Sequence, residues 1–252
     1  MKNKMFRPLK VQTLTWIVVT VTIFATGCGS SDRTQMRFVH AIQDGAAMDI
    51  DVNGTSEFTD ISFLGVQPSQ PGYTPVPSGT DTIKGVATGT TTQTFSATAS
   101  FSGSSHYTVV ATGFSQTGNN GSNVALLSVP DNTSGAPSGD VSFRVIHASP
   151  SGPGNVDVYI LLNPATCPSG TPAISALGYT QGSSYVSLPY NPNNATPPPG
   201  FTVCVTAASS LTPIFTEPTD PGTAGAVRTL VLTDVQDGTS MQKSFLELSD
   251  VN

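Results

Sequence analysis

Arg37-Phe38-Val39-His40-Ala41 recurs as Arg144-Val145-Ile146-His147-Ala148, and this repeated stretch decides the fold. Asp49-Ile50-Asp51-Val52 recurs in the same way as Asp157-Val158-Tyr159-Ile160. The remaining matched blocks keep their order along the chain: Leu64-Gly65 with Leu177-Gly178, Tyr73 with Tyr185, Val76-Pro77 with Leu188-Pro189, Tyr107–Thr112 with Arg228–Thr233, and Ala125–Val129 with Phe245–Ser249. Repeated blocks in one order indicate a tandem duplication at an offset of about 107 residues.

Each copy contains short β-rich segments bounded by turn residues. Met48–Val52 alternates apolar residues with Asp49 and Asp51, which is the period of a half-buried strand, and Asn53-Gly54 is a hairpin-type turn. No convincing amphipathic helix follows residue 28. We therefore expect an all-β chain of two tandem antiparallel, immunoglobulin-like β-sandwich modules, at residues 36–130 and 141–252, joined by a polar linker at 131–140.

The first residues have the pattern of a bacterial lipoprotein signal. Four cations precede an uncharged apolar run from Val11 to Ala25, which is shorter than the ~20 residues of a membrane-spanning helix. Ala25-Thr26-Gly27-Cys28 resembles a lipobox, in which the cysteine is lipidated and becomes the first residue. We predict a signal peptide at residues 1–27, a lipidated Cys28 and a polar tether at 28–35. A cleaved ordinary signal and a retained anchor are the alternatives.

Cleavage before Cys28 removes four of the ten Lys and Arg residues and none of the sixteen Asp and Glu residues, so the formal charge becomes 6 − 16 = −10. Nucleic acids and anionic lipid surfaces need clustered cations, and this charge argues against both as partners. Membrane contact is expected only through the lipid on Cys28. Gly29 in place of Asp at the second mature position favours the outer membrane, if the organism has one.

Two cysteines remain in the mature chain, Cys167 and Cys204. In an oxidising compartment their default state is a disulfide. A metal pair is the weaker alternative, because no His or second Cys stands at ligand spacing nearby.

The second copy carries a motif that resembles a known family. Arg144-Val145-Ile146-His147-Ala148-Ser149-Pro150 followed by Val156-Asp157-Val158-Tyr159 is similar to the bacterial family called domain of unknown function 4397. The first copy departs from it, with Ile42-Gln43 in place of Ser-Pro and Met48–Asp51 in place of Val-Asp-Val-Tyr. The resemblance covers most of residues 36–250. It implies secreted or surface-anchored β-sandwich modules, often in tandem, and no settled activity.

The repeated Arg37, His40 and Asp49, with Arg144, His147 and Asp157, form the candidate motif. A His–Asp pair could serve as a metal site or an acid–base pair. We favour a structural role, in which each histidine ring bonds to the turn that follows, because two ligands are too few for a closed metal site. Asp44, Asp49 and Asp51 are spaced closely enough to suggest calcium, but no converging loop surrounds them.

No pattern indicates catalysis or a cofactor. The chain lacks Gly-x-Ser-x-Gly, and no glycine-rich loop leads into a helix. We expect a non-enzymatic, lipid-anchored envelope protein with a binding, adhesion or structural role, in which polar loops such as Gln67–Pro75 and Asn191–Gly200 contact a glycan or protein partner. The alternative is an accessory or hydrolytic module that acts on envelope glycans or peptides.

Overall fold

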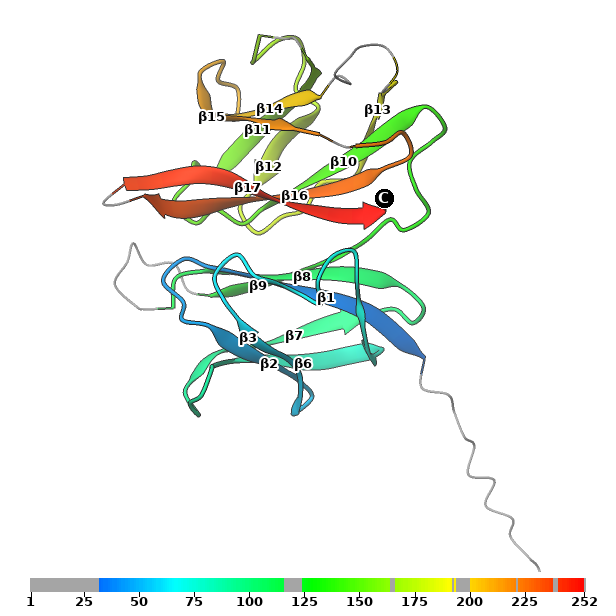
Figure 1. Ribbon diagram of the computed structural model, residues 1–252. Coiled ribbons are helices and arrows are strands. Elements are labelled where there is room, and N and C mark those ends of the chain that lie inside the picture. Colours follow the sequence, from blue (N-terminus) through cyan, green and yellow to red (C-terminus); the bar gives the residue numbers. More distant parts are fainter. Residues whose placement is uncertain are drawn as a thin grey trace, which may run out of the picture. The chain divides into compact units, whose positions relative to one another are not determined.

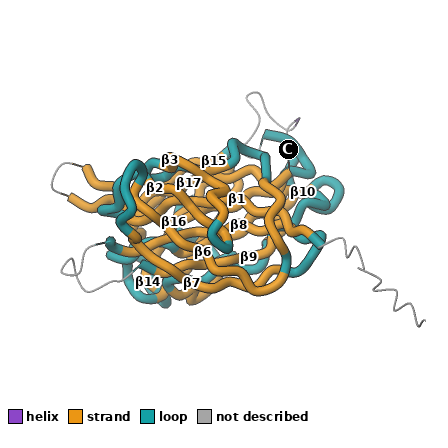
Figure 2. Tube along the Cα trace, turned by 90° about the horizontal axis from the view of Figure 1, so that it is seen from below, coloured by secondary structure: helices purple, strands orange, loops and turns teal. Residues whose placement is uncertain are grey.

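The computed structural model describes residues 32–115, 124–163, 166–191, 193, 200–220, 222–237 and 240–251. Within these ranges the chain is almost entirely β-strand, as Figure 2 shows, so the prediction of an all-β fold is confirmed. The signal peptide and Cys28 lie outside the described residues, and they stay predictions. The described residues belong to one compact unit, residues 31–252.

The first half of the unit builds two sheets, which we call the first module. Its inner sheet has the order β4-β1-β8-β9 with β5 added to β1, and its outer sheet has the order β3-β2-β6-β7. The strands are β1 (Arg33–Ile42), β2 (Met48–Val52), β3 (Thr55–Ile61), β4 (Val66–Gln67), β5 (Thr74–Pro77), β6 (Gly79–Ala87), β7 (Gln93–Phe101), β8 (His106–Gly113) and β9 (Ala125–Pro130). β1 begins at Arg33, inside the range predicted as tether.

The second half repeats this arrangement as the second module. Its inner sheet is β13-β10-β16-β17 and its outer sheet is β12-β11-β14-β15. The strands are β10 (Asp140–His147), β11 (Asn155–Leu162), β12 (Ile174–Gly178), β13 (Val186–Pro189), β14 (Phe201–Ala207), β15 (Pro213–Thr219), β16 (Val227–Asp237) and β17 (Ser240–Val251). In both modules the two sheets enclose an apolar core, which makes each module a sandwich.

One strand pair in each inner sheet is parallel, whereas we expected antiparallel pairing throughout. β1 runs parallel to β8, and β10 runs parallel to β16. Parallel neighbours need a long crossover connection. The outer-sheet strands, which lie between β1 and β8 or between β10 and β16 in the sequence, supply that connection.

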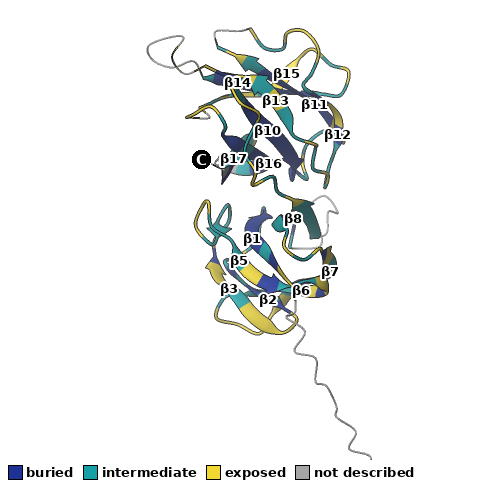
Figure 3. Cartoon of the chain, turned by 90° about the vertical axis from the view of Figure 1, so that its right-hand side faces the viewer, coloured by how far each residue is buried: buried dark blue, intermediate teal, exposed yellow. Residues whose placement is uncertain are grey.

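The two inner sheets face one another (Figure 1). β1 is therefore buried on both faces: Met36 and Phe38 point into the first module's core, while Val39 and Ala41 join a separate apolar cluster with Ile146 of β10. Figure 3 shows the consequence, because β1 and β10 are largely buried and β3 carries many exposed positions. Each inner sheet thus has one face on its own core and one face on the other module.

Backbone hydrogen bonds define which residues of the two modules are equivalent. The amide of Leu64 donates to the carbonyl of His40 over 2.8 Å, and the amide of Thr180 donates to the carbonyl of His147 over 2.9 Å. Both donors have a φ of 60°. Leu64 is thus equivalent to Thr180, and the sequence match of Leu64-Gly65 with Leu177-Gly178 was wrong by three residues. The match of Ala125–Val129 with Phe245–Ser249 was wrong by one residue, because the strand register makes Leu127 equivalent to Leu246 and Val129 equivalent to Leu248.

Candidate functional site: a buried arginine–aspartate cluster

The repeated arginines lie where the inner sheets meet. Alternation along β1 points Arg37 to the same face as Val39 and Ala41, away from its own module's core. Arg144 has the equivalent place on β10. Their residue exposures are 0% and 1%, which makes them the largest fully buried side chains of the described chain. A buried guanidinium needs a partner for its charge and for each donor.

Arg37 finds its partners in both modules. Its Nε donates to Thr108 Oγ1 of β8 over 2.8 Å, within the first module. Its remaining nitrogens reach β17 of the second module, where one donates to the Ser249 carbonyl over 2.9 Å and the other pairs with the Asp250 carboxylate. Asp131 Oδ2 lies 3.5 Å from the same guanidinium.

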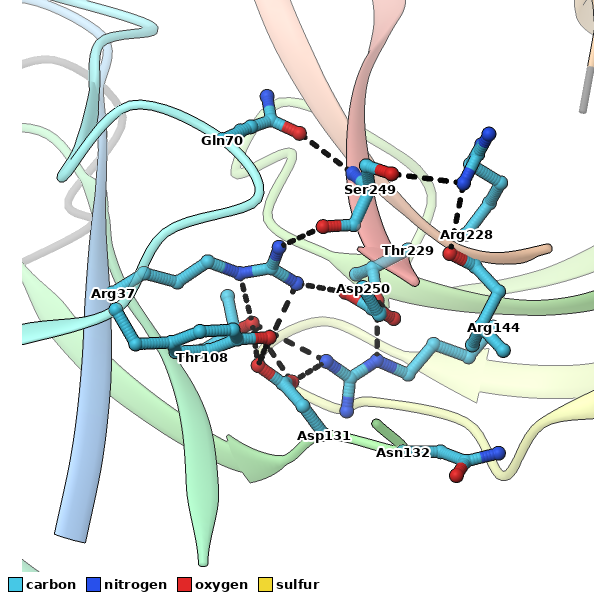
Figure 4. A network of polar contacts seen from close by, with 12 residues as sticks. Arg37, Gln70, Thr108, Asp131, Asn132, Arg144, Arg228, Thr229, Ser249 and Asp250 are labelled. Carbon is cyan, nitrogen blue, oxygen red and sulfur yellow. Dashed lines mark hydrogen bonds and ion pairs between the residues drawn. The ribbon is translucent and has the colours of Figure 1, made fainter. Parts of the chain in front are cut away.

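Arg144 repeats this geometry in the opposite direction (Figure 4). Its Nε donates to Thr229 Oγ1 of β16 over 2.8 Å, within the second module. The other nitrogens donate to the Pro130 carbonyl over 2.6 Å and pair with the Asp131 carboxylate, both of the first module. Each arginine therefore bonds a threonine of its own module and an aspartate of the other.

The two aspartates are also bonded within their own modules. Thr108 donates to Asp131 over 2.8 Å, as does the Tyr73 hydroxyl. The equivalent donors to Asp250 are Thr229, over 2.6 Å, and Tyr185, over 2.7 Å.

The two tyrosine rings also lie against the arginines. The Arg37 guanidinium carbon is 5.2 Å from the Tyr73 ring centre, and the Arg144 carbon is 4.8 Å from the Tyr185 ring centre, both within cation–π range. Burial and nearby carboxylates raise the pKa of Tyr73. Burial also raises the pKa of Tyr185, against the opposing effect of Arg144. Both phenols therefore stay protonated donors.

Two arginines and two aspartates give this cluster a balanced charge. Burial alone would lower the pKa of Arg37, but the Asp250 and Asp131 carboxylates more than offset it and raise the pKa. The guanidinium therefore stays charged inside the protein. The donors and acceptors of the cluster bond one another across the two modules. This arrangement can fix the register of one inner sheet against the other.

The two histidines are buried and bonded to the backbone of the turn that follows. His40 Nε2 lies 3.0 Å from the Ala46 carbonyl, and its Nδ1 accepts the Ile42 amide over 3.2 Å. His147 has the equivalent contacts with Pro153 and Ser149, both over 3.4 Å. Burial lowers the pKa of both rings, which keeps them neutral. Both rings thus contact the turn that follows their strand, and the structural role of the motif stays a prediction.

The motif aspartates do not meet the histidines; each bonds the neighbouring strand or turn instead. Asp49 accepts the Asp60 amide over 2.8 Å and the Thr88 hydroxyl over 2.9 Å. Asp157 accepts the amides of Ala176 and Ser209, over 2.7 and 2.8 Å. Among the described residues, neither Asp49 nor Asp157 bonds a histidine.

The calcium candidates also have separate partners. Asp44 accepts the Ser115 amide over 2.5 Å and lines a pocket of about 250 Å³, whereas Asp49 is committed to Asp60 and Thr88. Within the described ranges no three His, Cys, Asp or Glu side chains come close enough to hold a metal ion.

Cys167 and Cys204 form the predicted disulfide, with their Cα atoms 6.2 Å apart. The loop Gln67–Pro75, which we expected to be free for a partner, is engaged instead. Gln70 of this loop donates to the Glu247 carbonyl over 3.3 Å and accepts the Ser249 amide over 2.6 Å, both on β17. Most of the second predicted contact loop, Asn191–Gly200, lies outside the described residues.

Sequence reasoning found both arginines but missed their partners, Asp131 and Asp250. Asp131 stands in a stretch rich in Asn, Ser, Gly and Pro, which was assigned to the linker. A signal was present, because each aspartate follows the last strand block of its copy: Asp131 comes two residues after Val129, and Asp250 comes one residue after Ser249.

In the described part of the chain, no helix is long and apolar enough to cross a membrane.

Comparison with known proteins identifies the family of this chain but no function. No curated protein matches the sequence. A crystal structure of a "putative cell adhesion protein" from Bacteroides ovatus matches 86% of this chain and 98% of its own at 9% identity, but with a TM-score of 0.20 it supports no inference. The family model described as "Domain of unknown function (DUF4397)" matches residues 34–159, which is half of the chain. The chain therefore belongs to the DUF4397 family.

Proposed function

We propose that this protein is a lipid-anchored protein of the bacterial cell envelope, most simply of the outer membrane, with a binding, adhesion or structural role and no catalysis. One observation carries the non-catalytic part of the proposal. The polar residues that the chain repeats, Arg37 with Arg144 and His40 with His147, are buried and bonded to groups of the protein itself. A catalytic group has to touch its substrate, and these side chains touch only the protein.

The architecture supports a role in presenting a surface. An apolar cluster and four buried charges join the inner sheets. We therefore expect the two modules to move together and not as independent domains on a flexible linker. The outer sheets then face away from the module interface and carry the free strand edges β3, β7, β12 and β15.

Among these edges, β7 has the fewest features that block strand addition. β15 contains Pro213 and Pro218, and the Gln67 side chain bonds the backbone of β3 at Thr59. β12 has only five residues, and its Gly178 amide bonds the Gln181 side chain. β7 is nine residues long and contains neither proline nor charge. Such an edge can accept an extended peptide as a further strand, so we place the first search for a protein partner at β7.

The anchor is tested by Cys28→Ser in the full chain. We expect the variant to leave the membrane fraction or to accumulate as an unprocessed precursor, and wild type to incorporate labelled palmitate. A matched Cys167→Ser variant, which removes a different cysteine, should keep both membrane association and palmitate. Unchanged fractionation and unchanged mobility of Cys28→Ser would refute the anchor.

The binding role is tested on envelope polymers. The purified chain is incubated with peptidoglycan, envelope polysaccharides and extended peptides, and both retention and polymer length are measured. We expect retention of one class of polymer with no shortening. Shortened products would support the alternative, an accessory or hydrolytic module that acts on envelope glycans or peptides.

A further inference from the structure

We propose that the face through which the modules meet is a self-complementary pairing surface, whose partner is a second copy of the same module. In this chain the same polypeptide supplies that partner. We call the surface the pairing face; it consists, in the first module, of the side chains Arg37, Val39, Ala41, Tyr73, Thr108, Val110, Leu127, Val129 and Asp131.

The polar contacts have the exchange pattern of a two-fold interface. Arg37 pairs with Asp250, and its equivalent Arg144 pairs with Asp131, which is the equivalent of Asp250. In a two-fold interface, residue i of one copy contacts residue j of the other, and j in turn contacts i. Two first modules would therefore satisfy both arginines by pairing each Arg37 with the Asp131 of the other copy.

The apolar contacts follow the same rule. Each member of the apolar cluster has an equivalent in the other module that belongs to the same cluster or packs against it: Val39 with Ile146, Ala41 with Ala148, Val110 with Val231, Leu127 with Leu246, and Val129 with Leu248. Aliphatic side chains of similar size thus occupy both sides, and pairing of a module with its own copy keeps the contact apolar.

One position in the apolar contact differs between the two modules and favours the first–second pair. In the first module, Val66 pairs with Val39. In the second module, Gly182 pairs with Ile146, so Gly182 is the equivalent of Val66. A Cβ placed on Gly182 would lie 2.7 Å from Val129 Cγ1, so this contact is already tight. Two first modules would place Val66, in place of a glycine, against Val129, and two second modules would place the larger Leu248 against Gly182. Both self-pairs are more crowded here than the contact of Gly182 with Val129, so first–second pairs should form more readily than either self-pair.

In the intact chain the linker favours the internal pair. The Asn132 amide donates to the Tyr185 hydroxyl over 3.2 Å, and the Ala136 amide donates to the Gly225 carbonyl over 2.9 Å, so linker residues are bound to the second module. A tethered partner also has a high effective concentration. Pairing between copies becomes measurable once the linker is cut.

The test uses the full chain with a protease site inserted between Ser134 and Gly135, beside exposed linker positions. The folded protein is cut, unfolded in urea and refolded by dilution, and native mass spectrometry identifies the pairs by mass. Isotope-labelled and unlabelled batches are mixed before refolding, so that exchange of fragments is visible. We expect exchanged first–second pairs in the largest amount, together with smaller amounts of first–first and second–second pairs.

Arg37→Met separates the pairing face from general association. A first–first pair would lose both of its Arg37–Asp131 contacts, whereas a first–second pair would lose the contacts of Arg37 with Asp250 and Ser249 and keep the Arg144–Asp131 pair. The variant should therefore remove first–first pairs and retain a fraction of first–second pairs. Arg33→Met, at an exposed position of the same strand, is the matched control and should leave both kinds of pair as in wild type.

Two results would overturn the proposal. If refolded fragments exchange but form first–second pairs alone, the two faces are complementary to each other and not to themselves. If the fragments are recovered without any pairs, the pairing face has no affinity of its own.

Discussion

Replacing Arg37 by Met tests whether the buried cluster holds the modules together. The variant keeps most of the side chain's length but removes the group that pairs with Asp250, donates to Thr108 over 2.8 Å and donates to the Ser249 carbonyl over 2.9 Å. Removing one member of a buried pair costs about 3–5 kcal/mol, because the remaining charge has neither water nor a counter-charge. Unpaired acceptors add about 1 kcal/mol, so we expect a loss of about 4–6 kcal/mol.

The assay is urea unfolding of the chain that begins after Cys28. Far-UV circular dichroism is the suitable signal, because the one tryptophan of the sequence, Trp16, lies before that cysteine. Arg33→Met is the control, because this arginine is exposed at the start of β1 and donates to the Pro75 carbonyl over 2.6 Å. Water can replace an exposed hydrogen bond, so the loss is about 1 kcal/mol or less and this variant should unfold close to wild type.

A double variant separates the cost of the lost hydrogen bonds from the cost of leaving a buried carboxylate without its counter-charge. Arg37→Met leaves the cluster with one positive and two negative charges, and adding Asp250→Asn restores the balance. The double variant should therefore be less destabilised than the sum of the two single variants. The reasoning is refuted if Arg37→Met is no more destabilised than Arg33→Met, or if the effects of Arg37→Met and Asp250→Asn on the free energy of unfolding simply add.

Further tests concern the disulfide and the histidines. Cys204→Ser opens a bond between residues separated by 37 positions, and we expect the free energy of unfolding to fall by about 3–4 kcal/mol; labelling of both thiols in denatured, unreduced wild type would contradict this. Burial lowers the pKa of His147 below its ordinary value of about 6.5, so the folded state binds fewer protons than the unfolded state in that range. His147 stabilises fully above about pH 6.5 and loses that contribution as the pH falls toward its folded pKa. The urea midpoint of wild type should drop between about pH 7.5 and 5.5, and the drop should be smaller in His147→Gln.

The strands could be predicted because they depend on local pattern. Met48–Val52 has the alternation of a half-buried strand, and the structure places Met48, Ile50 and Val52 in the core. The disulfide followed from compartment and count. β3 and β15 were not recognised. The Asn53-Gly54 hairpin turn implies a strand after it, but β3 has no clean period of two, because its register against β2 shifts twice. β15 lacks a clear strand signal because it contains two prolines.

The sequence indicates the pairing of the modules less clearly than it indicates the strands. Phe38, Val39, Ala41 and Ile42 form a nearly continuous apolar run, which is typical of a strand buried on both faces. A sandwich that stood alone would expose one face of β1, so this run indicates a second layer. Which layer covers it depends on contacts more than 200 residues apart, such as Arg37 with Asp250, and no local pattern contains them.

The cluster and the apolar contacts contribute differently to the joined modules. The apolar cluster is built from small aliphatic side chains, among them Val39, Ala41 and Val110, which pack closely but tolerate sliding of one sheet over the other. The ion pairs are directional, and each displaced arginine would leave two charges buried without a partner. We infer that the apolar contacts supply most of the affinity and that Arg37 and Arg144 fix the register. A homodimer of a single module could acquire such contacts in pairs before the duplication, since one change that creates an Arg–Asp contact across a two-fold interface creates it twice.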